Sequence, residues 1–262
     1  FILFSSSLNS ISAQNFITIA STTSTEHSGL FNYILPIFTQ KTDIGVRIIA
    51  VGTGKAIKLA ERGDADILLV HHTPSENKFV KRGYGVKRFP VMFNDFVIVG
   101  PSDDPAKILK MRNVLDVLER ISKMELVFLS RGDESGTNKI ELSLWEKLSI
   151  NVKKDSGTWY RETGNGMGAT LNIASSMNGY TLTDRATWLS FKNKGSLKIL
   201  FEGDRRLHNQ YGIIKVSPIK FPHTKSELAQ EFIDWLISEH GQNSIQNYTI
   251  NGMQAFFPNA KN

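Results

Sequence analysis

Residues 15–38 read NFITIASTTSTEHSGLFNYILPIF, and this stretch decides the fold class. Residues 15–20 have the composition of a strand, and residues 21–28 are rich in hydroxyl side chains. Beyond that loop, apolar residues recur at the spacing of one helix face, namely Leu30, Phe31, Ile34, Leu35 and Phe38. A strand, a polar loop and a helix in this order form the basic unit of an α/β protein.

The same order recurs along the rest of the chain. The run at residues 67–70 is apolar without alternation, which predicts a strand covered by helices on both faces. Strands separated by helices predict an α/β protein with largely parallel sheets. Further strands are expected at residues 46–51, 93–99, 126–129, 180–183, 197–201 and 212–216.

Two series of these units predict two lobes. We place the chain crossings between the lobes near Gly100 and near Arg206. Residues 14–100 and 207–262 then form the first lobe, and residues 101–206 form the second. The second lobe is an insertion in this scheme, and the helices near the end of the sequence return to the first lobe.

Composition narrows the range of functions. The sequence has 262 residues, no cysteine and a net charge of +6. The lack of cysteine excludes disulfides, thiolate metal sites and a cysteine nucleophile. The basic residues are scattered rather than gathered in one stripe, so we predict no nucleic-acid binding and a surface that attracts small anions.

The first residues resemble the end of a secretory signal peptide. Residues 1–8 are apolar and serine-rich, and small residues at 10–13 precede Gln14. We therefore expect residues 1–13 to be the remnant of a signal peptide and the mature protein to lie in the periplasm. A lipid anchor on an N-terminal cysteine is excluded, and no later stretch is long and apolar enough to span a membrane.

Four strand-to-helix turns have the chemistry of an anion site. The N-terminus of a helix leaves backbone N–H groups unpaired and carries partial positive charge. Nearby hydroxyls and glycines complete an anion cradle. One such turn is usually only a helix cap, but four turns at the carboxyl ends of parallel strands indicate a ligand site. The turns are residues 21–29, 51–54, 130–137 and 164–168, two in each predicted lobe.

The first and third of these turns resemble each other. Both place a glutamate shortly before a Ser-Gly pair at a helix start, at Glu26 and at Glu134. Arg131 is the only full positive charge within the four turns, and a guanidinium can hold two oxygens of one anion. An ion pair with Asp133 or Glu134 is its alternative role. The sequence leaves open whether the carboxylates of Glu26, Asp133 and Glu134 face the anion or cap helices.

Several strings of residues resemble the tungstate-binding proteins of ABC uptake systems. They follow the order of that family over most of the chain from Ile19 to Arg185. The strings are residues 23–30, 51–56, 66–71, 94–101, 130–137, 159–164, 166–168 and 182–185.

This resemblance implies a two-lobed periplasmic binding protein of type II, with the ligand in the cleft between the lobes. Such a protein captures tungstate and delivers it to the permease of an ABC importer. It would act as a monomer, without turnover, cofactor or any metal besides that of the oxyanion. The implied anion contacts are Thr23, Ser24, Thr53, Arg131, Ser135, Gly136 and Thr137, with backbone N–H groups of Gly166, Met167 and Gly168.

A different tetrahedral oxyanion is the closest alternative. Phosphate near neutral pH carries a proton and needs an acceptor, whereas tungstate and molybdate need only donors. The residues do not separate tungstate from molybdate, and sulfate and phosphate stay open as ligands.

An enzyme is the more distant alternative. The glycines at 164 and 166 fit part of a dinucleotide fingerprint, but residues 159–163 are too polar for its buried first strand. The sequence has no Gly-x-Ser-x-Gly motif, which a hydrolase with a nucleophile elbow would need. We interpret His71 and His72 as residues at a strand end, and Asp184 as the N-cap of the helix that follows it.

Overall fold

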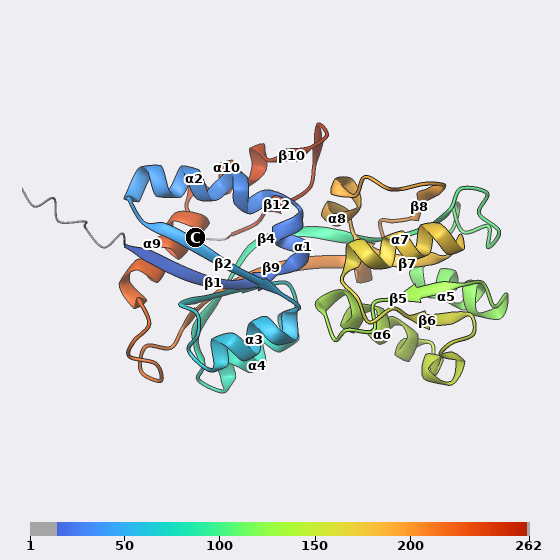
Figure 1. The fold of residues 1–262 in the computed structure, drawn as a ribbon, viewed down its shortest axis with the longest axis horizontal. Helices are drawn as coiled ribbons and strands as arrows, with labels where there is room; N and C mark the ends of the chain where they lie inside the picture. Colours follow the sequence, from blue (N-terminus) through green and yellow to red (C-terminus); the bar gives the residue numbers. More distant parts are fainter. Residues whose placement is uncertain (1–14, 261–262) are drawn as a thin grey trace, which may run out of the picture.

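The computed structural model describes residues 15–260 and shows two lobes side by side (Figure 1). The expected signal-peptide remnant at residues 1–13 lies outside the described residues. Strand β4 (Gly85–Pro101) runs through both lobes. The chain returns to the first lobe through β9 (His208–Val216), which pairs with β4 in antiparallel fashion.

The sheet of the first lobe has the order β2-β1-β3-β9-β4, with β12 added to β4. Strand β1 is parallel to both β2 and β3. The bounds of these strands are β1 (Phe16–Thr22), β2 (Gly45–Val51), β3 (Ile67–Val70) and β12 (Phe257–Pro258), and the pair β10 (Thr249–Ile250) and β11 (Met253–Gln254) lies apart.

Strand β3 shows why both faces of this sheet are covered. Ile67 and Leu69 belong to one hydrophobic cluster, with helices α2 and α9, whereas Leu68 and Val70 belong to another, with α3 and α4. Successive side chains of a strand point to opposite faces, so an unbroken apolar run feeds two cores. The prediction of a strand covered on both faces is confirmed. The helices of this lobe are α1 (Thr23–His27), α2 (Leu30–Thr42), α3 (Thr53–Glu61), α4 (Thr73–Lys81), α9 (Ser226–Ile237) and α10 (Glu239–Asn247).

The second lobe repeats this arrangement around the order β8-β4-β7-β5-β6. Phe128 of β5 packs edge-on against Trp145 of α6, with ring centroids 5.3 Å apart, in the core on one face. The elements of this lobe are β5 (Phe128–Ser130), β6 (Tyr160–Glu162), β7 (Tyr180–Asp184), β8 (Leu197–Phe201), α5 (Val114–Lys123), α6 (Gly136–Lys147), α7 (Met167–Met177), α8 (Arg185–Ser190) and the short 3₁₀ turns η1 (Val152–Asp155) and η2 (Arg205–Leu207).

The two-lobed α/β prediction is confirmed, but the sheets are mixed rather than largely parallel. Strand β4 is antiparallel to β9, β7 and β8, and β3 is antiparallel to β9. The reason is the path of the chain, because strands that leave one lobe and return to it run in opposite directions. Strand β4 changes its partner from β9 to β7 between Asp95 and Phe96. The crossings near Gly100 and Arg206 stay predictions about where the lobes divide.

Among residues 15–260, no helix is both long enough and apolar enough to cross a membrane.

Candidate anion-binding site between the lobes

The four strand-to-helix turns meet where the lobes face each other. β1 and β2 are parallel, as are β5 and β6, so the turns of each lobe lie at one edge of its sheet. Both lobes line a cavity of about 410 Å³ there. Its lining residues are Thr23, Ala50, Val51, Gly52, Gly54, Lys55, Lys58, Arg131, Asp133, Glu134, Gly164, Asn165 and Gly166.

The first turn is a strand end followed by a short helix. We predicted a loop from residue 21, but β1 continues to Thr22. The Thr22 hydroxyl then caps α1 by accepting a 3.4 Å hydrogen bond from the backbone N–H of Thr25. Thr23 lines the cavity, while Ser24 lies behind it with its side chain buried.

The second turn opens helix α3. Gly52 is the N-cap of this helix, and no side chain caps its first N–H groups. An uncapped helix N-terminus that faces a cavity is a ready donor set for an anion. The next residue, Thr53, joins the lobes, because its hydroxyl accepts a 3.2 Å hydrogen bond from the backbone N–H of Gly136.

The third turn has a strained, fixed backbone. Gly132 and Glu134 have φ values of 59° and 57°, in the left-handed region. A Cβ atom on Gly132 would lie 2.8 Å from Cβ of Glu162, so only glycine fits there. Ser135 caps α6 by accepting a 3.2 Å hydrogen bond from the N–H of Asn138.

Arg131 lies in this turn and is 5% exposed. One terminal nitrogen of its guanidinium is 2.5 Å from a carboxylate oxygen of Asp133. Its Nε and the hydroxyl of Thr137 are buried without a hydrogen-bond partner among the residues that the structure describes. A buried donor without a partner costs free energy. Both of these donors belong to the third turn, whose Arg131 lines the cavity.

The fourth turn opens helix α7. Gly166 is its N-cap, again without a side-chain cap, and lines the cavity together with Gly164. The side chain of Met167 is buried in the core shared by the lobes, so only the backbone of this residue is available to a ligand. The strand before this turn, β6, is polar because it is the edge strand of its sheet.

Three of the residues in the predicted site therefore line the cavity, namely Thr23, Arg131 and Gly166. The other seven belong to the same four turns but not to its lining. They are Ser24, Thr53, Ser135, Gly136, Thr137, Met167 and Gly168.

Known proteins are similar to this chain in both sequence and architecture. The PBP superfamily domain matches residues 10–240. The chain is 43% identical over 252 residues to "Tungstate-binding protein TupA" of Peptoclostridium acidaminophilum, which covers 95% of this chain and 87% of that protein. The chain belongs to the TupA family.

Two solved structures of similar proteins have the same fold. The tungstate-binding protein TupA of Desulfovibrio alaskensis G20 superposes with a TM-score of 0.82 at 43% identity, covering 94% of this chain and all of that one. The structure described as the tungstate ABC transporter of Geobacter sulfurreducens gives 0.81 at 45% identity, covering 89% and 98%.

The carboxylates of the first and third turns differ in their positions. Asp133 and Glu134 line the cavity, whereas Glu26 does not. Both oxygens of Asp133 are engaged, one with Arg131 and the other with the backbone N–H of Ser135 at 3.2 Å. The alternative role for Arg131, an ion pair with Asp133, thus exists, but in a buried position rather than at the surface.

His71 is a neighbour of the site that the sequence analysis missed. It directly follows β3, as predicted, but its ring is buried behind the first turn. Its Nε2 is 3.3 Å from the Ser24 hydroxyl, and a Cβ on Gly136 would lie 3.1 Å from its Cε1. The available signal was its place at the carboxyl end of a buried strand, where ligand sites gather.

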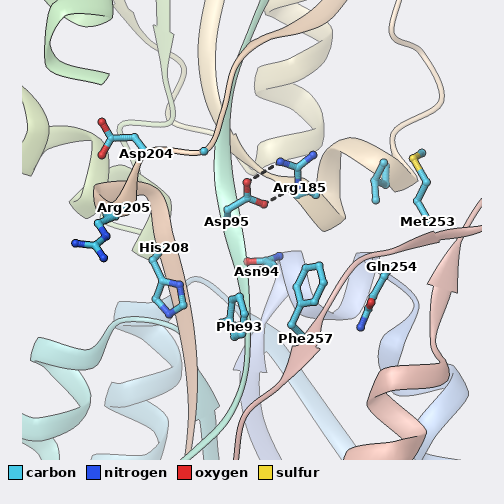
Figure 2. Close-up of a pocket in the computed structure, with 12 residues that line it drawn as sticks. Phe93, Asn94, Asp95, Arg185, Asp204, Arg205, His208, Met253, Gln254 and Phe257 are labelled. Carbon is cyan, nitrogen blue, oxygen red and sulfur yellow. Dashed lines mark hydrogen bonds and ion pairs between the residues drawn. The ribbon is translucent and has the colours of Figure 1, made fainter. Parts of the chain in front are cut away.

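A second cavity, of about 620 Å³, lies beside the strands that connect the lobes (Figure 2). Arg185 forms two hydrogen bonds of 2.6 Å to the carboxylate of Asp95 there and a third, of 2.5 Å, to Glu202. Phe93 and Phe257 stack in its wall, with centroids 5.2 Å apart. The guanidinium of Arg185 is therefore already engaged by two carboxylates. Asp184 caps α8 through the N–H of Thr187, which confirms its predicted role.

Proposed function

We propose that this chain is an extracytoplasmic solute-binding protein that captures tungstate between its lobes and delivers it to an ABC importer. The observation that carries this proposal is a pair of buried donors without partners among the described residues, Arg131 Nε and the Thr137 hydroxyl, in the turn whose Arg131 lines the cavity. The names of its TupA relatives support tungstate as the ligand. We propose tungstate rather than molybdate solely because of this likeness to the TupA relatives.

The proposed binding set combines one charge with many neutral donors. Arg131 supplies the charge at low effective dielectric, where an ion pair is strong. The uncapped N-termini of α3 and α7 supply backbone N–H groups and partial positive charge. The full set of proposed contacts is Thr23, Ser24, Thr53, Arg131, Ser135, Gly136 and Thr137, with the backbone of Gly166, Met167 and Gly168.

This donor set suits an oxyanion without protons. The P–OH group of monohydrogen phosphate needs a hydrogen-bond acceptor, and a free carboxylate oxygen could be that acceptor. The carboxylate of Asp133 is occupied on both oxygens, by Arg131 and by the N–H of Ser135. Tungstate and molybdate need no acceptor, so this site favours them over phosphate provided that two other carboxylates do not accept from the ligand: that of Glu134, which lines the cavity, and that of Glu26, whose Oε2 is buried without a partner among the described residues.

Capture by preorganised donors requires no bond breaking. We therefore propose that the protein binds without turnover, as a monomer in the periplasm, and passes its ligand to the permease. Purified protein should release tungstate chemically unchanged and should not convert common ester or nucleotide substrates. A hydrolytic rate that disappears on mutating a residue of the four turns would contradict a pure binding role.

Isothermal titration calorimetry with four oxyanions tests the proposal. Tungstate, molybdate, sulfate and phosphate are titrated into one preparation at fixed pH and ionic strength. We expect tungstate and molybdate to bind most tightly and phosphate most weakly. Tighter binding of phosphate would show that the carboxylate of Asp133 or Glu134 accepts a hydrogen bond from the P–OH group of the ligand. Absence of heat with all four anions would refute oxyanion capture.

A further inference from the structure

A chain of four buried polar side chains runs from the first turn to the strands that connect the lobes. The Ser24 hydroxyl is 3.3 Å from Nε2 of His71, and Nδ1 of His71 is 3.0 Å from Oδ1 of Asn209. The amide of Asn209 lies 2.7 Å from that of Asn94. His71 follows β3, Asn209 belongs to β9 and Asn94 to β4, so three strands hold this relay in place.

The imidazole of His71 is neutral in this setting. Burial lowers its pKa, and the positive charge of Arg131 adds to that effect, while Asp184 and the hydrogen bond to Asn209 oppose it. The ring cannot turn freely, because Tyr211 stacks on it with centroids 4.9 Å apart and Gly136 lies close to its edge. A neutral imidazole has one N–H donor and one acceptor nitrogen.

This leaves two hydrogen-bond directions along the relay. In the first, Nδ1 of His71 donates to Asn209, and Nε2 accepts the hydrogen of the Ser24 hydroxyl. In the second, Asn94 donates to Asn209, Asn209 donates to Nδ1 of His71, and Nε2–H donates to Ser24. Only the second direction releases the hydroxyl hydrogen of Ser24 from His71, which leaves it for a ligand or for Oγ1 of Thr22, 3.1 Å away.

Asn94 distinguishes the two directions. When its oxygen faces Asn209, its Nδ2 group is buried without a hydrogen-bond partner among residues 15–260. Amide oxygen and nitrogen have the same shape, so hydrogen bonding decides between them. When both amides are turned over, Nδ2 of Asn94 gains an acceptor at the same 2.7 Å separation, and its oxygen takes the position without a partner. A buried carbonyl oxygen without a partner is tolerated more often than a buried N–H donor, which favours the second direction.

We propose that His71 is a positioning residue that carries its proton on Nε2 and so directs the hydroxyl hydrogen of Ser24 towards the cleft. The proposal deepens the proposed function and rests on it for the identity of the ligand. Ser24 then donates to a deprotonated oxyanion and does not accept the proton of monohydrogen phosphate. The relay thereby contributes to selectivity between the two kinds of anion.

Nitrogen NMR of the histidine rings tests the tautomer directly. Protein labelled with ¹⁵N-histidine is recorded without ligand, and a His71→Gln sample assigns the His71 signals. We expect a protonated Nε2 and an unprotonated Nδ1. A protonated Nδ1 with an unprotonated Nε2 would overturn the proposal, as would an imidazolium at neutral pH. This measurement needs no ligand, so it decides the relay even if tungstate does not bind to the wild type.

Two substitutions separate positioning from packing. Glutamine can still donate an N–H to Ser24, whereas phenylalanine keeps the ring and loses the donor. We expect His71→Phe to weaken tungstate binding about tenfold and His71→Gln less than about threefold. The tungstate-over-phosphate preference should narrow in His71→Phe, because the Ser24 hydroxyl is then free to accept.

A double-mutant cycle completes the test. In a Ser24→Ala background, His71→Phe should cost no further affinity, because the hydroxyl that it positions is gone. Equal losses in both backgrounds would show that His71 acts only through packing and would overturn the proposal. If the wild type binds no tungstate, the proposed function fails, and the NMR result alone decides the relay.

Discussion

The first-lobe turn at residues 21–29 and the second-lobe turn at residues 130–137 look alike in sequence and differ in structure. The first continues a strand and then forms the short helix α1, capped by Thr22. The second is an irregular loop with two left-handed residues, followed by α6 with Ser135 as its cap. Similar composition, with a Ser-Gly pair in each, thus produced two different backbones.

Their chemistry differs in the same way. Ser24 of the first turn is neutral and rests on a buried histidine, His71. The second turn has the charge of Arg131 and rests on a buried carboxyl, Glu141, which accepts hydrogen bonds from Ser130 and Asn138 at either end of the turn. We infer that the second lobe attracts the anion and that the first lobe orients it.

The largest expected effect comes from removing that charge. Arg131→Ala should weaken tungstate binding by about 2–5 kcal/mol, the scale for deleting one partner of a buried charge pair. That is about 30-fold to several thousandfold in Kd, measured by titration calorimetry. Arg131→Lys should restore only part of the affinity, because an ammonium group cannot hold two oxygens in a fork.

Lys58 supplies the control for Arg131. It also lines the cavity, but from the first lobe and with an exposed side chain. Lys58→Ala should cost much less than Arg131→Ala if charge at the second turn is what holds the anion. Two outcomes would contradict this assignment: equal losses of tungstate affinity in both variants, or an affinity of Arg131→Ala within about twofold of the wild type. Either would mean that the charge of the second turn does not hold the anion.

The next effect concerns the group behind the second turn. Burial raises the pKa of Glu141 to about 7, and hydrogen bonds from four neutral donors oppose this shift without cancelling it. The donors are Ser130, Tyr160, Trp145 and Asn138. The folded state therefore holds a proton that the unfolded chain loses at lower pH. Stability from this group is present in acid and is lost as the pH rises to about 7, by about 3 kcal/mol in total.

Glu141→Gln tests this sign. Glutamine resembles the protonated acid and does not titrate, so the free energy of unfolding of the variant relative to that of the wild type should rise by about 2–3 kcal/mol between pH 5 and pH 8. Urea-induced unfolding at both pH values measures this difference. Glu76 shares the same pH window but pairs with Arg88, and it is present in both proteins, so its contribution cancels. A pH-independent difference would mean that the carboxyl does not titrate in this range.

The fold was largely predictable because its signals are local. An apolar run such as residues 67–70 encodes burial on two faces within four residues. The antiparallel pairing of β4 with β9 was not predictable in this way, because it depends on the path of the chain between lobes. The helix from Thr73 to Lys81 was also missed, since its polar residues hide the apolar face around Phe79.

The sequence indicates which turns meet around the cavity, but not the buried groups behind them, and the anion contacts themselves stay predictions. Arg131 and Gly166 stand out because charge and glycine at a helix start have a direct chemical meaning. The contact between His71 and Asn209 joins residues 138 positions apart in sequence. No local pattern encodes such a pair, and a histidine after a strand has many possible roles.

The smallest expected effect separates two single hydroxyls, one in each turn. The Thr137 hydroxyl has no protein partner among the described residues, whereas that of Ser24 already contacts His71 and Thr22. Thr137→Ala should therefore weaken tungstate binding by about 1–2 kcal/mol, about five- to thirtyfold, without lowering the melting temperature. Ser24→Ala should lower both affinity and melting temperature, because it also leaves Nε2 of His71 without its hydrogen-bond partner. Ser143→Ala is the matched control, since within residues 15–260 that hydroxyl bonds only to the carbonyl of Ile140 in its own helix. If Thr137→Ala destabilises the free protein as much as Ser24→Ala does, its hydroxyl is a structural group, and the second turn holds the anion through Arg131 and its backbone alone.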